Sequence, residues 1–285
     1  MVLSKKTVWA VSVLGCAALL IFFFLDLPAA QSVYRPGTWF GAFFRVAAPM
    51  MPPVFGLLFS GCLARSESEP AGWRFFGCFT ALLFASAGGY LFFHYLGRSH
   101  PAAVAALSLL LLSGSLLLGG VLHPRPETLR RTAVTAVIVI AAVFLTVELL
   151  KNIWGRQRFC FMADPAAEFT RWLFPQGRPS SDAFKSFPSG HTANGSMVLL
   201  LLLLPSVFPG AERHRLLLKL FAGGWIVLTA LSRMLEGMHF ASDVTAGFLV
   251  AFWVFCAVSG AAQQRRPKGK PERKEVPRCG NAGQN

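Results

Sequence analysis

Apolar runs recur along almost the whole chain of 285 residues, and they constrain its fold more than any other feature. The runs are about 15–22 residues long, close to the length of a helix that crosses a bilayer. They do not alternate polar and apolar residues, as the strands of a membrane barrel would. We therefore predict an all-α, polytopic membrane protein. The predicted spans are residues 7–25, 49–64, 75–96, 102–122, 132–150, 190–204, 216–231 and 244–261.

Composition agrees with this prediction, since 54% of the residues are hydrophobic and 14% are charged, whereas soluble domains carry about 25% charged residues.

Residues 31–48 contain several aromatic side chains and are predicted as an interfacial segment. The run at 49–64 is short and contains Pro52 and Pro53, so the sequence leaves open whether it crosses fully. The longest polar connection is 151–188. Residues 263–285 are predicted to form a basic, disordered tail.

The net charge of +14 has two readings, of which nucleic-acid binding is the less favoured. The cations lie in loops and in the tail between apolar runs, where the positive-inside rule and contact with anionic membrane lipids explain them better. Because eight spans put both termini on one side and most loop cations lie on that side, we expect both termini to be cytoplasmic. The connection 151–188 would then face outward, in a protein of the inner (cytoplasmic) membrane.

Ionisable residues gather between the last two runs, although such groups are costly at a membrane boundary and are usually retained for function. His239 and Asp243 are four residues apart and would lie on one face of a helix. A carboxylate in that position can hold an imidazole in one tautomer and stabilise its charged form. The alternative is an interfacial histidine beside a helix-capping aspartate.

Three polar stretches fall at the predicted outward ends of helices and can therefore converge. They are Lys151 to Arg158, Pro188-Ser189-Gly190-His191, and Ser232 to Asp243, which includes Arg233. The cations suit phosphate oxygens, and the second stretch opens a helix, where free N–H groups and the dipole attract anions. Two histidines on opposite sides of a phosphoryl group could attack phosphorus and protonate the leaving oxygen. The alternative is a set of cations that anchor helix ends to headgroups.

The order and spacing of these residues resemble the signature of the type 2 phosphatidic acid phosphatase superfamily, in its bacterial membrane-bound branch. That signature reads Lys-x6-Arg-Pro, then Pro-Ser-Gly-His, then Ser-Arg-x5-His-x3-Asp. The chain departs from it at Phe159, where the family usually has proline. The resemblance implies a six-helix core at 66–262, with accessory transmembrane segments at 1–65 and the tail at 263–285.

The resemblance also implies a role for each motif residue. His239 would be the nucleophile that forms a phosphohistidine, Asp243 would orient it, and His191 would be the general acid. Phosphate-binding roles fall on Lys151, Arg158, Ser189, Gly190 and Arg233. We also expect Arg156 to contact phosphate or a headgroup. The family is metal-independent, so we expect no metal and no cofactor.

These residues predict a lipid phosphatase that hydrolyses a phosphomonoester or diphosphate at the outer face of the membrane. Family members act on undecaprenyl diphosphate, phosphatidylglycerophosphate, phosphatidic acid or lipid A, and the sequence does not select among them. The alternatives are a lipid phosphotransferase with the same intermediate, and a catalytically silent protein that binds phospholipid headgroups. We expect a lipid phosphate and membrane lipids as partners and no nucleic acid, while the oligomeric state stays open.

Overall fold

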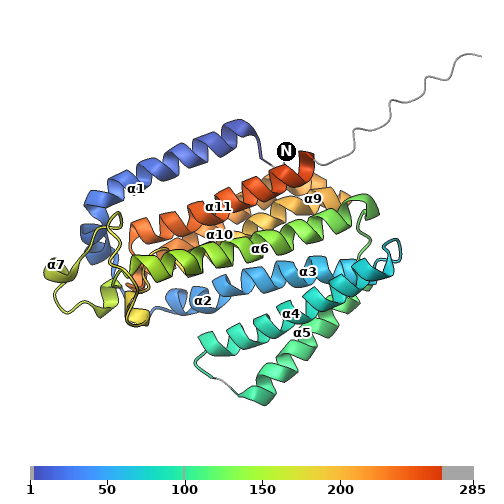
Figure 1. The fold of residues 1–285 in the computed structure, drawn as a ribbon, viewed down its shortest axis with the longest axis horizontal. Coiled ribbons are helices and arrows are strands. Elements are labelled where there is room, and N and C mark those ends of the chain that lie inside the picture. The colour runs from blue at the N-terminus through green and yellow to red at the C-terminus, as the bar shows by residue number, and fades with distance from the viewer. Residues whose placement is uncertain (1–2, 99, 265–285) are drawn as a thin grey trace, which may run out of the picture.

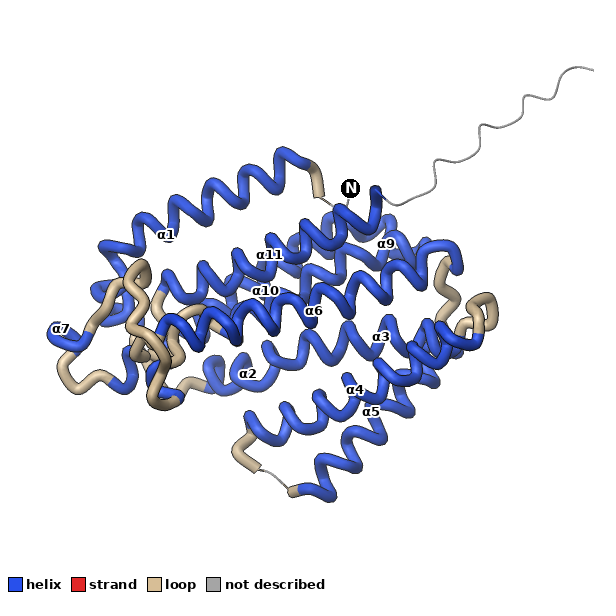
Figure 2. Tube along the Cα trace, in the orientation of Figure 1, coloured by secondary structure: helices blue, strands red, loops and turns tan. Residues whose placement is uncertain are grey.

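The computed structural model describes residues 3–98 and 100–264, and all regular structure in those ranges is helical (Figures 1 and 2). The long helices are α1 (Lys5–Val33), α3 (Met51–Arg65), α4 (Ala71–Tyr95), α5 (Pro101–Val121), α6 (Pro126–Trp154), α10 (Arg215–Leu235) and α11 (Ala241–Gln264). The shorter α-helices are α2 (Trp39–Ala47), α7 (Pro165–Glu168), α8 (Gly190–Gly195) and α9 (Leu204–Val207). The 3₁₀ turns are η1 (Ala48–Met50), η2 (Phe159–Phe161), η3 (Asp182–Phe184), η4 (Ser196–Leu203) and η5 (Pro209–His214).

Eight stretches of the described chain are long and apolar enough to cross a membrane, which confirms the predicted multi-pass fold. The helix ends follow local chemistry. Pro101 and Pro126 occupy first helical positions, where the missing N–H costs nothing. Gly155 closes α6 with φ = 54°, a left-handed conformation that a residue with a side chain rarely adopts.

The second span differs from the prediction. Residues Trp39–Arg65 form one span built from α2, η1 and α3, so the interfacial segment predicted at 31–48 is wrong over its second half. Prolines did not end the helix because Pro52 and Pro53 lie in the first turn of α3. N–H groups in a first turn have no intrahelical acceptor, and a proline there removes no helical hydrogen bond. A 3₁₀ turn, η1, joins the two pieces.

The helices form one bundle, in which α6, α10, α11 and the span Gly190–Val207 lie at the centre (Figure 1). α1 packs along α11, and α3 packs along α6, while α4 and α5 pair with each other and with α3. Large apolar side chains such as Leu14, Phe24 and Leu145 are exposed on the outside of the bundle, as expected for a surface that faces lipid.

The division of the chain at residue 65 remains a prediction. Phe59 and Leu63 of α3 belong to the same buried cluster as Val198 and Phe255. α1 begins and α11 ends at the same end of the bundle, the right-hand end in Figure 1. The tail predicted at 263–285 lies outside the described residues from position 265 onward.

Candidate active site

The three predicted stretches come together at the left-hand end of the bundle in Figure 1, where α6 and α10 end and α8 and α11 begin. The connection between α6 and α8 covers this end. Polar groups are buried here to an unusual degree for a membrane boundary. Arg233 and His239 are 1% and 2% exposed, and Asp243 is fully buried. Such burial of charge is costly unless the groups pair with one another.

His239 lies in the turn between α10 and α11, and its ring is fixed through one nitrogen. Nδ1 lies 2.7 Å from the carbonyl oxygen of Ser186, to which it can donate in the neutral tautomer protonated at Nδ1. The nearest oxygen of Asp243 is 3.9 Å from Nδ1. Burial lowers the pKa of His239 well below its usual value, and the positive charges of Arg158 and Lys151 lower it further. The ring is therefore neutral at pH 7, with Nε2 carrying the lone pair that a nucleophile needs.

Asp243 lies in the first turn of α11 and accepts three hydrogen bonds besides its approach to His239. Arg156 Nη1 donates to Oδ1 at 2.6 Å. Ser186 Oγ and the Phe240 backbone N–H donate to Oδ2 at 2.6 and 2.8 Å. Ser186 thus contacts both members of the predicted histidine–aspartate pair. It stands two residues before the Pro-Ser-Gly-His stretch, and its proximity to that stretch was the one available signal for it.

Arg156 corrects one expectation, because its guanidinium is held in a buried network of protein groups. Its Nη2 donates to Asp26 Oδ2 at 3.0 Å, and its Nε donates to the Thr170 carbonyl at 2.9 Å. The Phe240 ring lies 4.1 Å from the guanidinium carbon. All three guanidinium nitrogens are committed within the protein, so Arg156 is a structural partner of Asp243 and not a phosphate ligand. Asp26 lies on α1, and sequence reasoning did not find it.

His191, in the first turn of α8, is the second predicted catalytic histidine. Its Nε2 is buried and has no hydrogen-bond partner within the described residues. The Tyr95 ring packs edge-on against it, with centroids 5.0 Å apart. A buried polar atom without a partner is rare in a folded protein and commonly marks a functional position.

Arg158 and Lys151 supply positive charge beside the histidines. Arg158 Nη1 donates to Asp182 Oδ2 at 2.6 Å, while its buried Nε lacks a partner in the part of the chain that the structure describes. Lys151 is 3.9 Å from the Glu148 carboxylate. A Cβ atom on Gly190 would stand 2.8 Å from Lys151 Nζ, so any side chain at this position would displace the ammonium group. Glycine here keeps the lysine against the start of α8.

Ser189 and Arg233 complete the predicted set and have partners within the protein. Ser189 is the N-cap of α8, and its Oγ accepts from the Thr192 N–H at 3.2 Å and from the Thr192 hydroxyl at 3.0 Å. A hydroxyl that accepts twice still has its proton to donate to an anion. Arg233 donates from Nη2 to the Gly41 carbonyl and from Nε to Ser232 Oγ. Arg233 therefore joins α10 to α2 as well as supplying charge.

Phe159, the departure from the family pattern, packs in an aromatic cluster. Its ring lies 5.2 Å from that of Tyr34 and 6.1 Å from that of Phe240. It is 8% exposed. The position therefore supports the turn that carries His239 through packing, where a proline would act through backbone stiffness.

Comparisons with known proteins agree with the motif residues. Residues 132–267 match the model of the PAP2 superfamily. The chain is 35% identical over 77 residues to phosphatidylglycerophosphatase B of Bacillus subtilis (strain 168), and the match covers 26% of this chain and 38% of that protein. No solved structure matches significantly. The family match begins within α6, reaches the end of α11 and contains every predicted site residue, so the C-terminal part of the chain carries a PAP2 domain.

Proposed function

We propose that the protein is an integral membrane lipid phosphatase that works through a phosphohistidine at His239. The observation that carries the proposal is the convergence of the buried His239 and the half-buried His191 with Lys151 and Arg158 at one end of the bundle. Both cations lie close enough to act electrostatically on His239. A neutral nucleophile beside fixed cations can attack a phosphoryl group whose oxygens those cations bind.

In the first step His239 Nε2 would attack phosphorus, and the bond from phosphorus to the leaving oxygen would break. Protonated His191 would give its proton to that oxygen. In the second step water would attack the phosphohistidine, pass a proton to His191 and break the N–P bond, so that inorganic phosphate leaves. The positive charge that develops on the His239 ring would be stabilised by the Ser186 carbonyl and by Asp243, which lie 2.7 and 3.9 Å from Nδ1.

The site lies at the ends of candidate membrane spans. A site near the headgroups would suit a substrate whose chains stay in the bilayer. The charge distribution supports cytoplasmic termini and an outward-facing site. The relative in Bacillus is a phosphatidylglycerophosphatase by name. Phosphatidylglycerophosphate, phosphatidic acid, undecaprenyl diphosphate and lipid A share the phosphate ester or anhydride that this site would cleave.

Phosphate release from that panel of lipids by the purified protein, with EDTA present, tests the proposal. His239→Ala should abolish release from the preferred lipid. His214→Ala, which changes an exposed histidine at the other end of the bundle, should leave it intact. Release that persists in His239→Ala, or no release from any lipid by folded wild-type protein, would refute the phosphohistidine phosphatase. Transfer of the phosphoryl group to an added acceptor lipid, measured in the same assay, would show that the protein is a phosphotransferase and not a phosphatase.

A further inference from the structure

A chain of buried charges connects the first helix to the catalytic centre. Asp26 and Arg156 are each 1% exposed, and Asp243 is fully buried. Arg156 lies between the two carboxylates, at 3.0 Å from Asp26 and 2.6 Å from Asp243. An unpaired charge in such a place would be strongly destabilising, so each member depends on the others.

Asp26 also holds the start of α11 directly. Its Oδ1 accepts from the Ser242 backbone N–H at 2.8 Å, and its Oδ2 accepts from the Ser242 hydroxyl. The Ser242 Oγ in turn lies 2.8 Å from Arg156 Nη1. The carboxylate therefore fixes both the neighbour of Asp243 in sequence and its partner in space.

We propose that Asp26 is a positioning residue for catalysis, which holds Arg156 and Ser242 so that Asp243 keeps its place beside His239. This inference rests on the proposed function. It gives α1 a part in the reaction, although sequence reasoning placed α1 in an accessory segment. Asp26 touches neither substrate nor the reacting atoms, and it acts through Arg156 and Ser242.

Steady-state kinetics of Asp26→Asn tests the proposal, because asparagine keeps the shape and removes the charge. We expect kcat to fall by about tenfold or more while KM changes by less than about twofold, since the phosphate ligands are untouched. Asp26→Glu should recover part of kcat. The control is Glu67→Gln, an exposed carboxylate in the α3–α4 loop, which should behave as wild type.

The double variant Asp26→Asn/Arg156→Met separates positioning from general destabilisation. Residues that act as one unit are not additive, so it should lose little more activity than Arg156→Met alone. The positioning role would be refuted if folded Asp26→Asn kept the wild-type kcat. It would also be refuted if the fold-losses in kcat of the two single variants multiplied in the double variant. In either case the proposed phosphatase function would still stand. An inactive wild type would instead refute the phosphatase itself.

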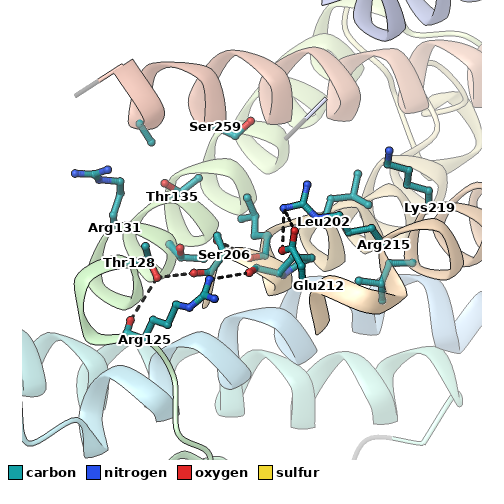
Figure 3. A pocket seen from close by; sticks show the side chains of 15 residues that line it. Arg125, Thr128, Arg131, Thr135, Leu202, Ser206, Glu212, Arg215, Lys219 and Ser259 are labelled. Atoms are coloured by element: carbon teal, nitrogen blue, oxygen red, sulfur yellow. Dashed lines mark hydrogen bonds and ion pairs between the residues drawn. The ribbon is translucent and has the colours of Figure 1, made fainter. Parts of the chain in front are cut away.

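A second, independent observation lies at the opposite end of the bundle. A cavity of about 440 Å³ opens there between α6, the η4–α9 segment, α10 and α11 (Figure 3). These are the helices that carry the catalytic residues at their other ends. Among the residues that the structure describes, Arg125, Arg131, Arg215 and Lys219 line it together with one acid, Glu212.

The charges in this cavity are unbalanced. Glu212 is 2.8 Å from Arg215, which accounts for one cation. For the other three, no carboxylate of residues 3–98 and 100–264 lies within ion-pair distance. Hydroxyl groups add hydrogen-bonding capacity to the walls. They belong to Thr128, Thr132, Thr135, Ser206 and Ser259.

A second cavity of about 620 Å³ adjoins the first and shares Arg131, Thr135 and Ala262 with it. Its walls include Val134, Ile138 and Val258 together with the charged residues Glu69, Glu127 and Arg130, so an apolar surface forms part of it directly beside the basic cavity. A phospholipid has the same division, with an anionic phosphate next to hydrocarbon chains. Cations fixed at a helix-bundle end with adjacent apolar walls suit such a headgroup.

We infer that this cavity binds a phosphate group on the membrane face opposite the catalytic site, and that an anionic phospholipid supplies it. Native mass spectrometry from micelles that contain equal phosphatidylglycerol and phosphatidylcholine tests this. Wild type should retain phosphatidylglycerol in preference by about fivefold or more, and Arg131→Ala/Lys219→Ala should lose that preference. Arg74→Ala, an exposed cation outside both cavities, should keep it.

Inorganic phosphate separates the two sources of the ligand. If inorganic phosphate at millimolar concentration displaces phosphatidylglycerol from wild type, the cavity recognises the phosphate group that the two molecules share, and the site is confirmed. If phosphate binds to wild type but not to Arg131→Ala/Lys219→Ala, and the lipid shows no preference, the site takes free phosphate. Equal retention of both lipids without phosphate binding, or an unchanged preference in the double variant, would refute the site.

Discussion

The Nδ1 atom of His239 donates to the main-chain carbonyl of Ser186 at 2.7 Å, and not to a side chain. The side-chain hydroxyl of the same serine donates to Asp243 at 2.6 Å. Ser186 therefore ties the nucleophile and the carboxylate to one point of the chain, just before the turn into α8. Backbone atoms cannot be changed by a conservative substitution, but the hydroxyl can.

Ser186→Ala should lower kcat by about tenfold, because it removes one donor to a buried carboxylate while the carbonyl still holds His239. A lost hydrogen bond to a charged group costs about 1.5–3 kcal/mol. Because the phosphate ligands are unchanged, KM should change little. Steady-state kinetics with the preferred lipid measures both constants. Ser180→Ala, at an exposed position of the same connection, serves as control, and equal rates in the two variants would contradict the role of the hydroxyl.

Asp182→Asn should lower KM for an anionic lipid by about two- to fivefold. Asp182 is exposed, with 74% of its side chain accessible, and its carboxylate is 2.6 Å from Arg158. It therefore competes with substrate phosphate for the guanidinium, and exposed ion pairs contribute about 0–1 kcal/mol. The effect should shrink as salt increases. A higher KM would show instead that Asp182 holds Arg158 in its binding position. Asp164→Asn, another exposed carboxylate on the connection, is the control.

Gly247→Ala should destabilise the protein by about 1–3 kcal/mol, the usual cost of forcing an extra methyl into a packed site. A Cβ atom at Gly247 would overlap the main-chain carbonyl oxygen of Ser189, which cannot rotate away. Since Ser189 begins α8, activity should fall as well. Gly260 lies on the same helix with open space around its Cβ position, so Gly260→Ala should melt at or above the wild-type temperature. Equal melting of the two variants would contradict the predicted clash.

The stability of the folded protein should depend on pH through His239. Burial lowers the pKa of this imidazole below its value in the unfolded chain, and Arg158, Lys151 and His191 lower it further, while the Ser186 carbonyl and Asp243 oppose them. Below about pH 6.5 the unfolded chain binds a proton that the folded protein does not, so stability falls as pH falls. Thermal melting from pH 7 to pH 5 should therefore decline less in His239→Gln than in wild type. Parallel curves for the two proteins would contradict a lowered pKa at His239.

The spans and the motif residues could be predicted because both are local properties of the sequence. A run of apolar residues defines its own helix, and His239 and Asp243 are only four residues apart in the sequence. His239 nevertheless lies in the turn before α11 and not on the helix itself. The error at 31–48 arose because the aromatic side chains of this segment were taken as interfacial anchors, whereas Trp39–Arg65 form one span. Pro52 and Pro53 fall in a first turn and leave that span intact.

Asp26 and the role of Arg156 could not be predicted, because both depend on contacts between distant parts of the chain. An aspartate near the end of an apolar run carries no local mark of its partner, and Arg156 lies 130 residues away. The pairing also changes the role that the sequence suggests for Arg156. Beside Arg158 it looks like one more phosphate ligand, yet it faces two carboxylates.

The long distance in sequence between Asp26 and its partners has a consequence for how the protein is assembled in the membrane. α1 precedes α6 in the chain, so the carboxylate of Asp26 is synthesised before its arginine partner, and Ser242 follows 216 residues after Asp26. Because isolated charge is costly in lipid, α1 should stay loosely inserted or near the headgroups until α6 and α11 arrive. The buried network would then be completed only after α11 has been inserted, so that the active site cannot form before α11 is in place.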